Sequence, residues 1–270
     1  MNSVVGRIKE VKQPRGGYIK PSSFICTHIE DGRILSDKEN VSASIIGMAV
    51  DYLTRFCIGT KREKAFEISL KGAKNAREQI EAEQLLHSIK GLDDESIIAA
   101  CKLVSFDVWY RNPVNAIRCE SYEEIYPDKD TISNIRTLVE RSLAFVEMHG
   151  PITKDSFTFE PESTNMHRNS WEDFGGYSAT VTAGDGDFLT EDTLWDFKVS
   201  KSKPTSKHTL QVLMYWIMGQ HSEKKEFKNI TKIGIFNPRL NNVYLLSVTD
   251  IPQETIRIVE RDVIEYANCK

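Results

Sequence analysis

Residues 184–199 read GDGDFLTEDTLWDFKV, and this stretch decides how the second half of the chain folds. Two extended segments flank a short loop near residues 190–193, and a two-residue or a four-residue loop in the same register places Leu189 opposite Leu194. The charged side chains then form two cross-strand pairs, Asp187 with Asp196 and Asp185 with Lys198. Directly opposite residues point to the same face of a sheet, as do residues two apart along a strand. The stretch therefore predicts an antiparallel hairpin with one charged face.

The other face of this hairpin is apolar, and we expect it to pack on the core. Its side chains are Phe188, Trp195, Phe197 and Val199. On the charged face, three carboxylates repel one another unless a divalent cation lies between them, and oxygen ligands suit Mg²⁺ or Mn²⁺ better than zinc. A lysine two residues from a metal-binding aspartate can orient or deprotonate a water molecule, or offset the charge of a phosphate. The alternative is a solvated face, with Asp192 as turn material and Asp185 as either a ligand or a turn residue.

The segments around the hairpin alternate between strand and helix patterns. We predict strands at residues 156–160, 177–189, 193–199, 232–236 and 243–248. Helical patterns predict helices at residues 42–57, 76–90, 94–104, 131–149, 205–219 and 253–266. This order is typical of an α/β protein with a central mixed sheet flanked by helices.

A length of 270 residues is enough for one large domain or two small ones, and the composition, 40% hydrophobic and 27% charged, is that of a globular protein. We expect a single domain. We divide it into an N-terminal arm (1–40), a helical region (41–150), a sheet core (151–250) and a C-terminal helix (251–270).

The five cysteines form no CxxC pair, which favours free thiols in a reducing cytoplasm; they are Cys26, Cys57, Cys101, Cys119 and Cys269. No apolar stretch approaches the length of a membrane span, so we expect a cytoplasmic protein with no membrane partner. A net charge of −4 argues against coating nucleic acid through bulk charge, although a local basic groove remains compatible with it.

Three short motifs follow one another along the second half of the chain: Gly184-x-x-Asp187, Asp196-x-Lys198 and Gln211-x-x-x-Tyr215. In this order and spacing they resemble the motifs of the PD-(D/E)XK nucleases, in particular the RecB-like exonuclease branch. The resemblance covers roughly residues 155–248. It implies a restriction-endonuclease-like core with an N-terminal helical insertion, and hydrolysis of DNA that depends on Mg²⁺ or Mn²⁺.

The resemblance also implies a role for each motif residue. Asp187 and Asp196 would hold the metal ion together with the backbone carbonyl of Phe197, and Lys198 would act on the attacking water. The catalytic set would be completed from the following helix by Gln211 and Tyr215, which lie one helical turn apart. The alternative for Tyr215 is a half-buried tyrosine of the core.

RecB-like enzymes carry a G-x-x-x-H motif on an early helix, and its histidine joins the metal. This chain has Gly47-x-x-x-Asp51 instead, and an aspartate can also bind Mg²⁺. The alternative is that Asp51 pairs with Arg55 on the helix surface. If this helix is not the family's first helix, residues 131–149 take its place, with Glu140 as the best acid.

A basic segment follows the Asp196-x-Lys198 strand, because residues 197–222 contain no acidic residue. Its candidate substrate-binding residues are Lys201, Lys203, Lys207 and His208. The segment leads into a helix N-terminus, which itself attracts phosphate, so a polynucleotide backbone could run there. The alternative is a flexible basic surface loop.

Together these features predict a metal-dependent phosphodiesterase that acts on DNA, as an exonuclease of low sequence specificity, through attack by a metal-activated water. Three alternatives stay open. The first is a catalytically silent nuclease-fold module that binds DNA, and the second is a Mg²⁺ enzyme acting on small phosphates in a closed pocket. The third is a structural protein whose carboxylates face solvent.

Overall fold

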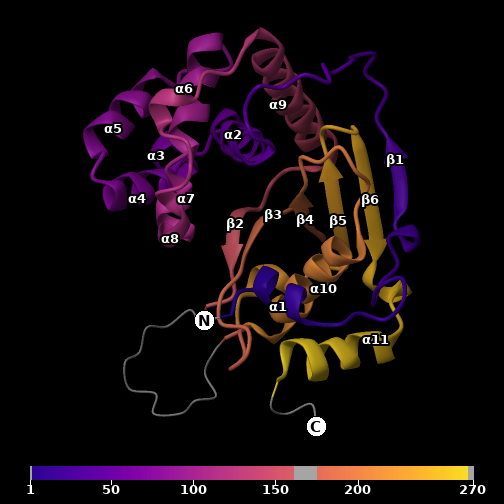
Figure 1. Cartoon of the computed structure of the whole chain (residues 1–270). Coiled ribbons are helices and arrows are strands. Elements are labelled where there is room, and N and C mark those ends of the chain that lie inside the picture. Colours follow the sequence, from indigo (N-terminus) through magenta and orange to yellow (C-terminus); the bar gives the residue numbers. More distant parts are fainter. Residues whose placement is uncertain (1, 161–174, 267–270) are drawn as a thin grey trace. The chain divides into compact units, whose positions relative to one another are not determined.

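The hairpin of residues 184–199 lies within a six-stranded mixed sheet (Figure 1). In this computed structural model, which describes residues 2–160 and 175–266, the strands are β1 (Ile25–His28), β2 (Lys154–Thr158), β3 (Asp185–Leu189), β4 (Thr193–Phe197), β5 (Lys232–Asn237) and β6 (Asn242–Ser247). Their spatial order is β1-β6-β5-β4-β3-β2. Strands β4 and β5 are parallel, and every other pair of neighbours is antiparallel. The chain is therefore an α/β protein with a mixed sheet, as the sequence predicts.

The register between β3 and β4 is the one expected from the sequence. Leu189 lies opposite Leu194, and Phe188 lies opposite Trp195. The turn between the strands is closed by a backbone hydrogen bond from Thr190 N–H to the Thr193 carbonyl, at 3.0 Å. The predicted strand of residues 193–199 ends at Phe197, so the hairpin is shorter than expected at this end.

Two units make up the chain, and each has its own buried core. The sheet unit comprises Met1–Ile29, His149–Lys198 and Ser202–Lys270, and the helical unit comprises Glu30–Met148 and Val199–Lys201. The main segment of the helical unit, Glu30–Met148, is thus inserted in the chain between β1 and β2, and the short segment Val199–Lys201 follows β4. Val199, expected on the apolar face of the hairpin, instead packs against the core of the helical unit.

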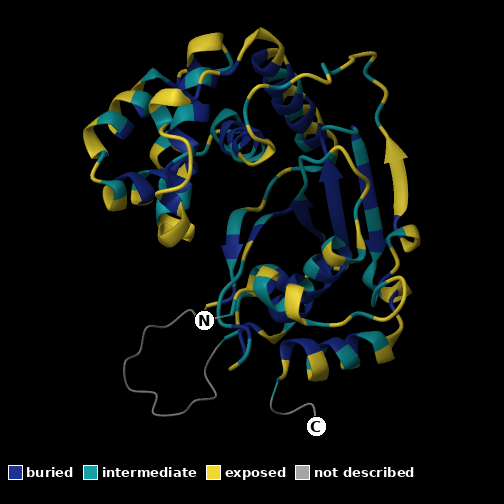
Figure 2. Ribbon diagram, in the orientation of Figure 1, coloured by how far each residue is buried: buried dark blue, intermediate teal, exposed yellow. Residues whose placement is uncertain are grey.

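Three helices accompany the sheet within its unit: α1 (Val4–Glu10), α10 (Ser206–His221) and α11 (Gln253–Ile258), which continues as a π-helix (Val259–Ile264). Helix α10 contacts β4 and β5, and α1 packs against α10 (Figure 1). Apolar side chains of β3, β4 and β5 pack with those of α10 in one cluster because the strands present Leu189, Leu194, Ile233 and Ile235 to it. The strands β4 and β5 are mostly buried, whereas every residue of the edge strand β1 is exposed (Figure 2).

The helical unit contains α2 (Ala43–Cys57), α3 (Arg62–Ala65), α4 (Glu67–Ala76), α5 (Gln79–Ser88), α6 (Asp94–Val104), α7 (Asp107–Arg111), α8 (Pro113–Ala116) and α9 (Lys129–His149). Within its core, the buried Asp107 carboxylate accepts hydrogen bonds from the hydroxyls of Tyr52 and Ser69, both at 2.6 Å. Helices α4 and α7 approach closely at Gly72, where a Cβ atom would lie 1.9 Å from the Phe106 carbonyl oxygen.

The structure corrects the sequence prediction in three further places. The arm of residues 1–40 contains α1 and β1, and β1 extends the sheet. The strand expected at 177–189 begins only at Asp185, because the Tyr177 hydroxyl donates a hydrogen bond to the Gly184 carbonyl at 2.7 Å and folds the preceding segment back. The helix expected at 76–90 is interrupted at Arg77, whose φ of +65° ends α4 before α5 begins.

In the described ranges, every helix is too short or too polar to serve as a membrane span. Four of the five cysteines are free thiols: Cys26, Cys57, Cys101 and Cys119. The fifth, Cys269, and the end of the predicted C-terminal helix lie outside the described residues.

Candidate functional site

Asp187 and Asp196 occupy neighbouring positions where β3 and β4 diverge. Extending the observed register by one residue places Asp187 opposite Asp196, so both side chains leave the strands on the α10 side of the sheet. The regular pairing stops here, and the Phe197 N–H donates to Oδ2 of Asp187 at 2.5 Å. This bond holds the Asp187 carboxylate beside the Asp196–Phe197 peptide bond.

The Asp196 carboxylate is buried, with a relative exposure of 2%. Lys198 Nζ lies 2.8 Å from each of its oxygens and donates a hydrogen bond to Oδ1. Oδ2 lies within ion-pair distance of Nζ but accepts no hydrogen bond from any described residue. The Lys198 N–H bonds to the Phe236 carbonyl at 2.9 Å, which extends the pairing with β5 and fixes the lysine backbone. The site therefore contains a largely buried ion pair with one carboxylate oxygen left for another partner.

Gln211 and Tyr215 face this pair from α10. The Gln211 side-chain amide donates to the Tyr215 hydroxyl at 2.9 Å. Tyr215 is 3% exposed, and its ring packs on Phe157 and Phe159. Burial, and secondly the negative charge of Asp196, raises the pKa of Tyr215 well above its usual range. Tyr215 is thus both a core residue and a protonated hydroxyl whose charge state is coupled to the acidic cluster.

His208 begins the same face of α10, three residues before Gln211. Its Nδ1 accepts a hydrogen bond from the Thr205 N–H at 3.2 Å, so the ring proton of the neutral form sits on Nε2. Burial, and secondly the charge of Lys198, lowers the pKa of His208 below its usual range. His208 is therefore a neutral ring at pH 7, whereas the sequence suggested a cation in a basic segment.

The lysines expected to bind substrate are divided between the two units. Lys203 and Lys207 are exposed on the sheet unit, directly before and within the first turn of α10. Lys201 belongs to the helical unit, where its ammonium lies 3.9 Å from a Glu39 carboxylate oxygen and donates to the Asp37 carbonyl at 3.3 Å. Only the first two lysines share a unit with the carboxylates.

The two acids proposed as ligands from early helices also lie in the helical unit. Asp51 is half-buried on α2. Glu140, on α9, forms an ion pair with Arg33 at 2.5 Å. Neither acid belongs to the unit that contains Asp187 and Asp196.

A metal ion at this end of β4 would have Asp187, Asp196 and the Phe197 carbonyl as its candidate donors. Among residues 2–160 and 175–266, no group of three or more His, Cys, Asp or Glu side chains is gathered as a metal site. Asp185 is exposed at the start of β3. A cation held by Asp187, Asp196 and the Phe197 carbonyl would complete its shell with water, as Mg²⁺ commonly does with one or two carboxylates.

The contacts that hold the start of α10 could not be predicted from the sequence. The Thr209 hydroxyl donates to the Ile19 carbonyl at 2.7 Å. Gly17, at φ +92°, lies so close to α10 that a Cβ atom there would be 2.5 Å from the Ser206 Cβ. The absence of a Cβ atom at Gly17 permits this close approach of the backbone to α10.

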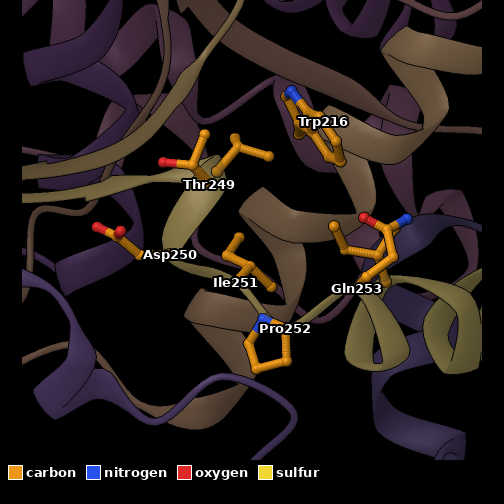
Figure 3. A pocket seen from close by; sticks show the side chains of 8 residues that line it. Trp216, Thr249, Asp250, Ile251, Pro252 and Gln253 are labelled. Atoms are coloured by element: carbon orange, nitrogen blue, oxygen red, sulfur yellow. The ribbon is translucent and has the colours of Figure 1, made fainter.

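Two pockets lie away from these residues. One, of about 480 Å³, lies in the sheet unit between α10 and α11 (Figure 3). Trp216 lies on one side of it and Pro252 on another, and the indole N–H of Trp216 already donates to the Ile230 carbonyl at 3.0 Å. The other, of about 400 Å³, lies in the helical unit beside α2. Neither pocket is lined by the carboxylates of β3 and β4.

Two aspartates, a lysine, a neutral histidine, a glutamine and a protonated tyrosine thus lie near one end of β4 in the sheet unit. Such a set can bind a hard cation and donate hydrogen bonds to an anionic ligand. No protein-family model matches this chain, and neither the curated proteins nor the solved structures gave a match.

Proposed function

We propose that this protein is a metal-dependent nuclease that hydrolyses the phosphodiester bonds of DNA, with Asp187, Asp196 and Lys198 at its active site. The observation that carries the proposal is the buried Asp196 carboxylate: it is 2% exposed, paired with Lys198 and left with one oxygen that accepts no hydrogen bond from a described residue. A buried ion pair adds little net stability, because desolvation of the two charges offsets their attraction. A functional role would account for the burial of this ion pair.

The residues of the site fit a divalent cation of the Mg²⁺ or Mn²⁺ type. Asp187 and Asp196 offer hard oxygen ligands, and Oδ2 of Asp196 lacks a hydrogen-bond donor. When bound, such a cation would lower the pKa of a water molecule and offset the charge that develops on the phosphate. Lys198 would hold that water or the phosphate by its ammonium, while its pairing with Asp196 fixes its position.

The surrounding residues support a phosphate ester as the substrate. Lys203 and Lys207 are exposed at the start of α10, a 16-residue helix whose N-terminal N–H groups favour anions. Backbone contacts of this kind carry no base information, so the proposed enzyme has low sequence specificity. We propose exonuclease action, with metal-activated water as the nucleophile. DNA as the partner and a restriction-endonuclease-like core remain part of this proposal, and rest on the motif order.

The test is degradation of linear and circular DNA with Mg²⁺ and with EDTA. We expect Mg²⁺-dependent loss of linear DNA and survival of circular DNA. Asp196→Asn should lower the rate at least about 100-fold, since even partners of metal ligands contribute 10–100-fold. A matched control is Asp192→Asn on the same hairpin, whose carboxylate pairs with Lys232 at 2.7 Å and is 45% exposed. It should retain the wild-type rate.

Three results would count against the proposal. A wild-type protein that cleaves no nucleic acid with Mg²⁺ or Mn²⁺ would exclude it. So would equal rates in the wild type and Asp196→Asn. Tight DNA binding without cleavage under every metal condition would instead favour the catalytically silent DNA-binding module.

A further inference from the structure

The two ring nitrogens of His208 differ in their hydrogen bonds to the rest of the protein. Nδ1 accepts the Thr205 N–H at 3.2 Å, in the geometry of a capping box at the first turn of α10. Among the described residues, no hydrogen bond is made by Nε2, the nitrogen that carries the proton in this tautomer. A half-buried ring is thus locked with a single N–H donor available.

The ring sits on the face of α10 that serves the site. His208, Gln211 and Tyr215 follow the i, i+3, i+7 spacing of one helix face. His208 interacts electrostatically with both Lys198 and Asp196, and Tyr215 interacts with Asp196 and Asp187. The donor therefore lies within the same group of side chains as the proposed metal ligands.

We propose that His208 is a neutral hydrogen-bond donor, through Nε2–H, to a phosphate oxygen of the nucleic acid bound at this site. The assignment rests on the proposed nuclease function and deepens it. Thr205 fixes the tautomer, and the ring lies on the face of α10 that also carries Gln211 and Tyr215. A neutral donor adds a directional bond to the phosphate without adding a second positive charge beside Lys198. The role of His208 thus differs from that of Lys203 and Lys207, which are exposed and act through charge.

Replacing His208 with glutamine or with glutamate, which have nearly the same size and shape, separates this role from helix capping. Glutamine and glutamate at this position both accept the Thr205 N–H in a standard capping box, but only glutamine also carries an N–H donor. We expect His208→Gln to keep the melting temperature and to stay within a few-fold of the wild-type cleavage rate. His208→Glu should keep the melting temperature and lose about 100-fold in rate, the typical effect of removing one donor to a charged transition state. His208→Met, which is neutral and lacks the donor, should lose a similar factor and thereby exclude charge repulsion as the cause.

Two measurements without a metal ion test the same point. In EDTA, a fluorescein-labelled single-stranded oligonucleotide should bind His208→Gln and the wild type with the same salt slope, because a neutral donor releases no counterion. A cationic histidine would instead make the wild-type slope steeper by about 0.7. The imidazole ¹⁵N shifts at pH 7.5 should show a proton on Nε2 and none on Nδ1.

The failures of the two proposals can be told apart. A wild type without metal-dependent cleavage overturns the nuclease function, and this role for His208 with it. A wild type that cleaves, with the glutamine and glutamate variants at equal rates, overturns only the role of His208. A proton on Nδ1, or a steeper wild-type salt slope, overturns it as well.

Discussion

Asp196 and Lys198 form an ion pair at 2.8 Å. Removing one partner has a different cost from removing the other. The carboxylate is 2% exposed and the lysine side chain 25% exposed, so the aspartate is the one that cannot regain its hydration. A buried charge that loses its partner typically costs about 3–5 kcal/mol, whereas removing both charges is close to neutral. The pair thus offers a stability readout that does not depend on activity.

Lys198→Met should therefore destabilise the protein by about 3 kcal/mol, since it leaves Asp196 buried without a counter-charge. The double variant Asp196→Asn with Lys198→Met should recover most of this loss. Urea unfolding of both variants measures the two values. Equal stability of the single and double variants would mean that water reaches Asp196 and that the pair is not buried as described.

Tyr215 belongs to both the candidate site and the core, and a single substitution can distinguish these two roles. Tyr215→Phe keeps the ring that packs on Phe157, and removes the hydroxyl that accepts from Gln211. We expect a loss of about 1 kcal/mol or less in stability and of about 10-fold or more in cleavage rate. Tyr244→Phe is the control: this tyrosine is also buried and hydrogen-bonded, to the Asn242 amide at 3.1 Å. If both variants lose activity and stability in the same proportion, Tyr215 is a core residue only.

At the residue scale, the sequence predicted which side chains would meet on one strand pair, because strand parity alone decides this. The strand register predicts that Asp187 and Asp196 lie opposite each other. Helical spacing predicts that Gln211 and Tyr215 share one face of their helix. The sequence could not place Lys201, because its position depends on Glu39 from a distant part of the chain. Nor could it show that His208 is neutral, because this follows from burial and from a backbone donor.

At the scale of elements, the β3–β4 hairpin was predictable because its period of two and its loop length leave one register. Helices α2, α6 and α9 were predictable because their apolar stripes are long. Strand β1 gave no such signal: it has four residues, all exposed, on the edge of the sheet. The break between α4 and α5 was missed because Arg77, rather than glycine or asparagine, adopts the left-handed conformation there.

Two helical glycines should respond in opposite ways to alanine. Gly72→Ala would place a Cβ atom 1.9 Å from the Phe106 carbonyl oxygen and should destabilise by at least about 3 kcal/mol. Gly47→Ala meets nothing nearer than Val199 at 4.0 Å and should stabilise by about 0.5–1 kcal/mol through helix propensity. Chemical unfolding of both variants measures these values. A neutral Gly72→Ala would contradict the close packing of α4 on α7.

The contact between the segment after β1 and α9 should make stability depend on pH. Arg141 holds the Asp31 carboxylate through two bonds, at 2.7 and 2.9 Å, and thereby keeps the pKa of that carboxyl well below its usual range. Because the folded pKa is lower than the unfolded value of about 3.9, the bond stabilises the fold above that value and is lost as the pH falls below it.

Asp31→Asn should therefore cost about 3 kcal/mol at pH 7, because Arg141 is only 6% exposed. The difference from the wild type should shrink between pH 5 and pH 2, as measured by melting in that range. Asp94→Asn is the control, since this aspartate pairs with Arg136 while 68% exposed and should change stability by less than about 1 kcal/mol. A pH-independent difference for Asp31→Asn would show that the carboxylate charge is not the cause.

At the scale of the whole molecule, the order of motifs along the chain agrees with the order of elements in the sheet unit. The Gly184, Asp196 and Gln211 motifs fall on β3, β4 and α10, which are neighbours in that unit. The sequence alone did not reveal that the helical region has a separate core, because apolar stripes do not say which partners they meet. It also placed Val199 with the strand, whereas that residue packs with the helices.

The most direct test of the central claim is calorimetric titration of the purified protein with Mn²⁺ in the absence of substrate. We expect binding to the wild type, unchanged binding to Asp192→Asn, and a loss of at least about 10-fold in affinity for Asp187→Asn and for Asp196→Asn. Wild-type affinity in both of these variants, each folded by circular dichroism, would contradict the claim that the two aspartates hold a metal ion.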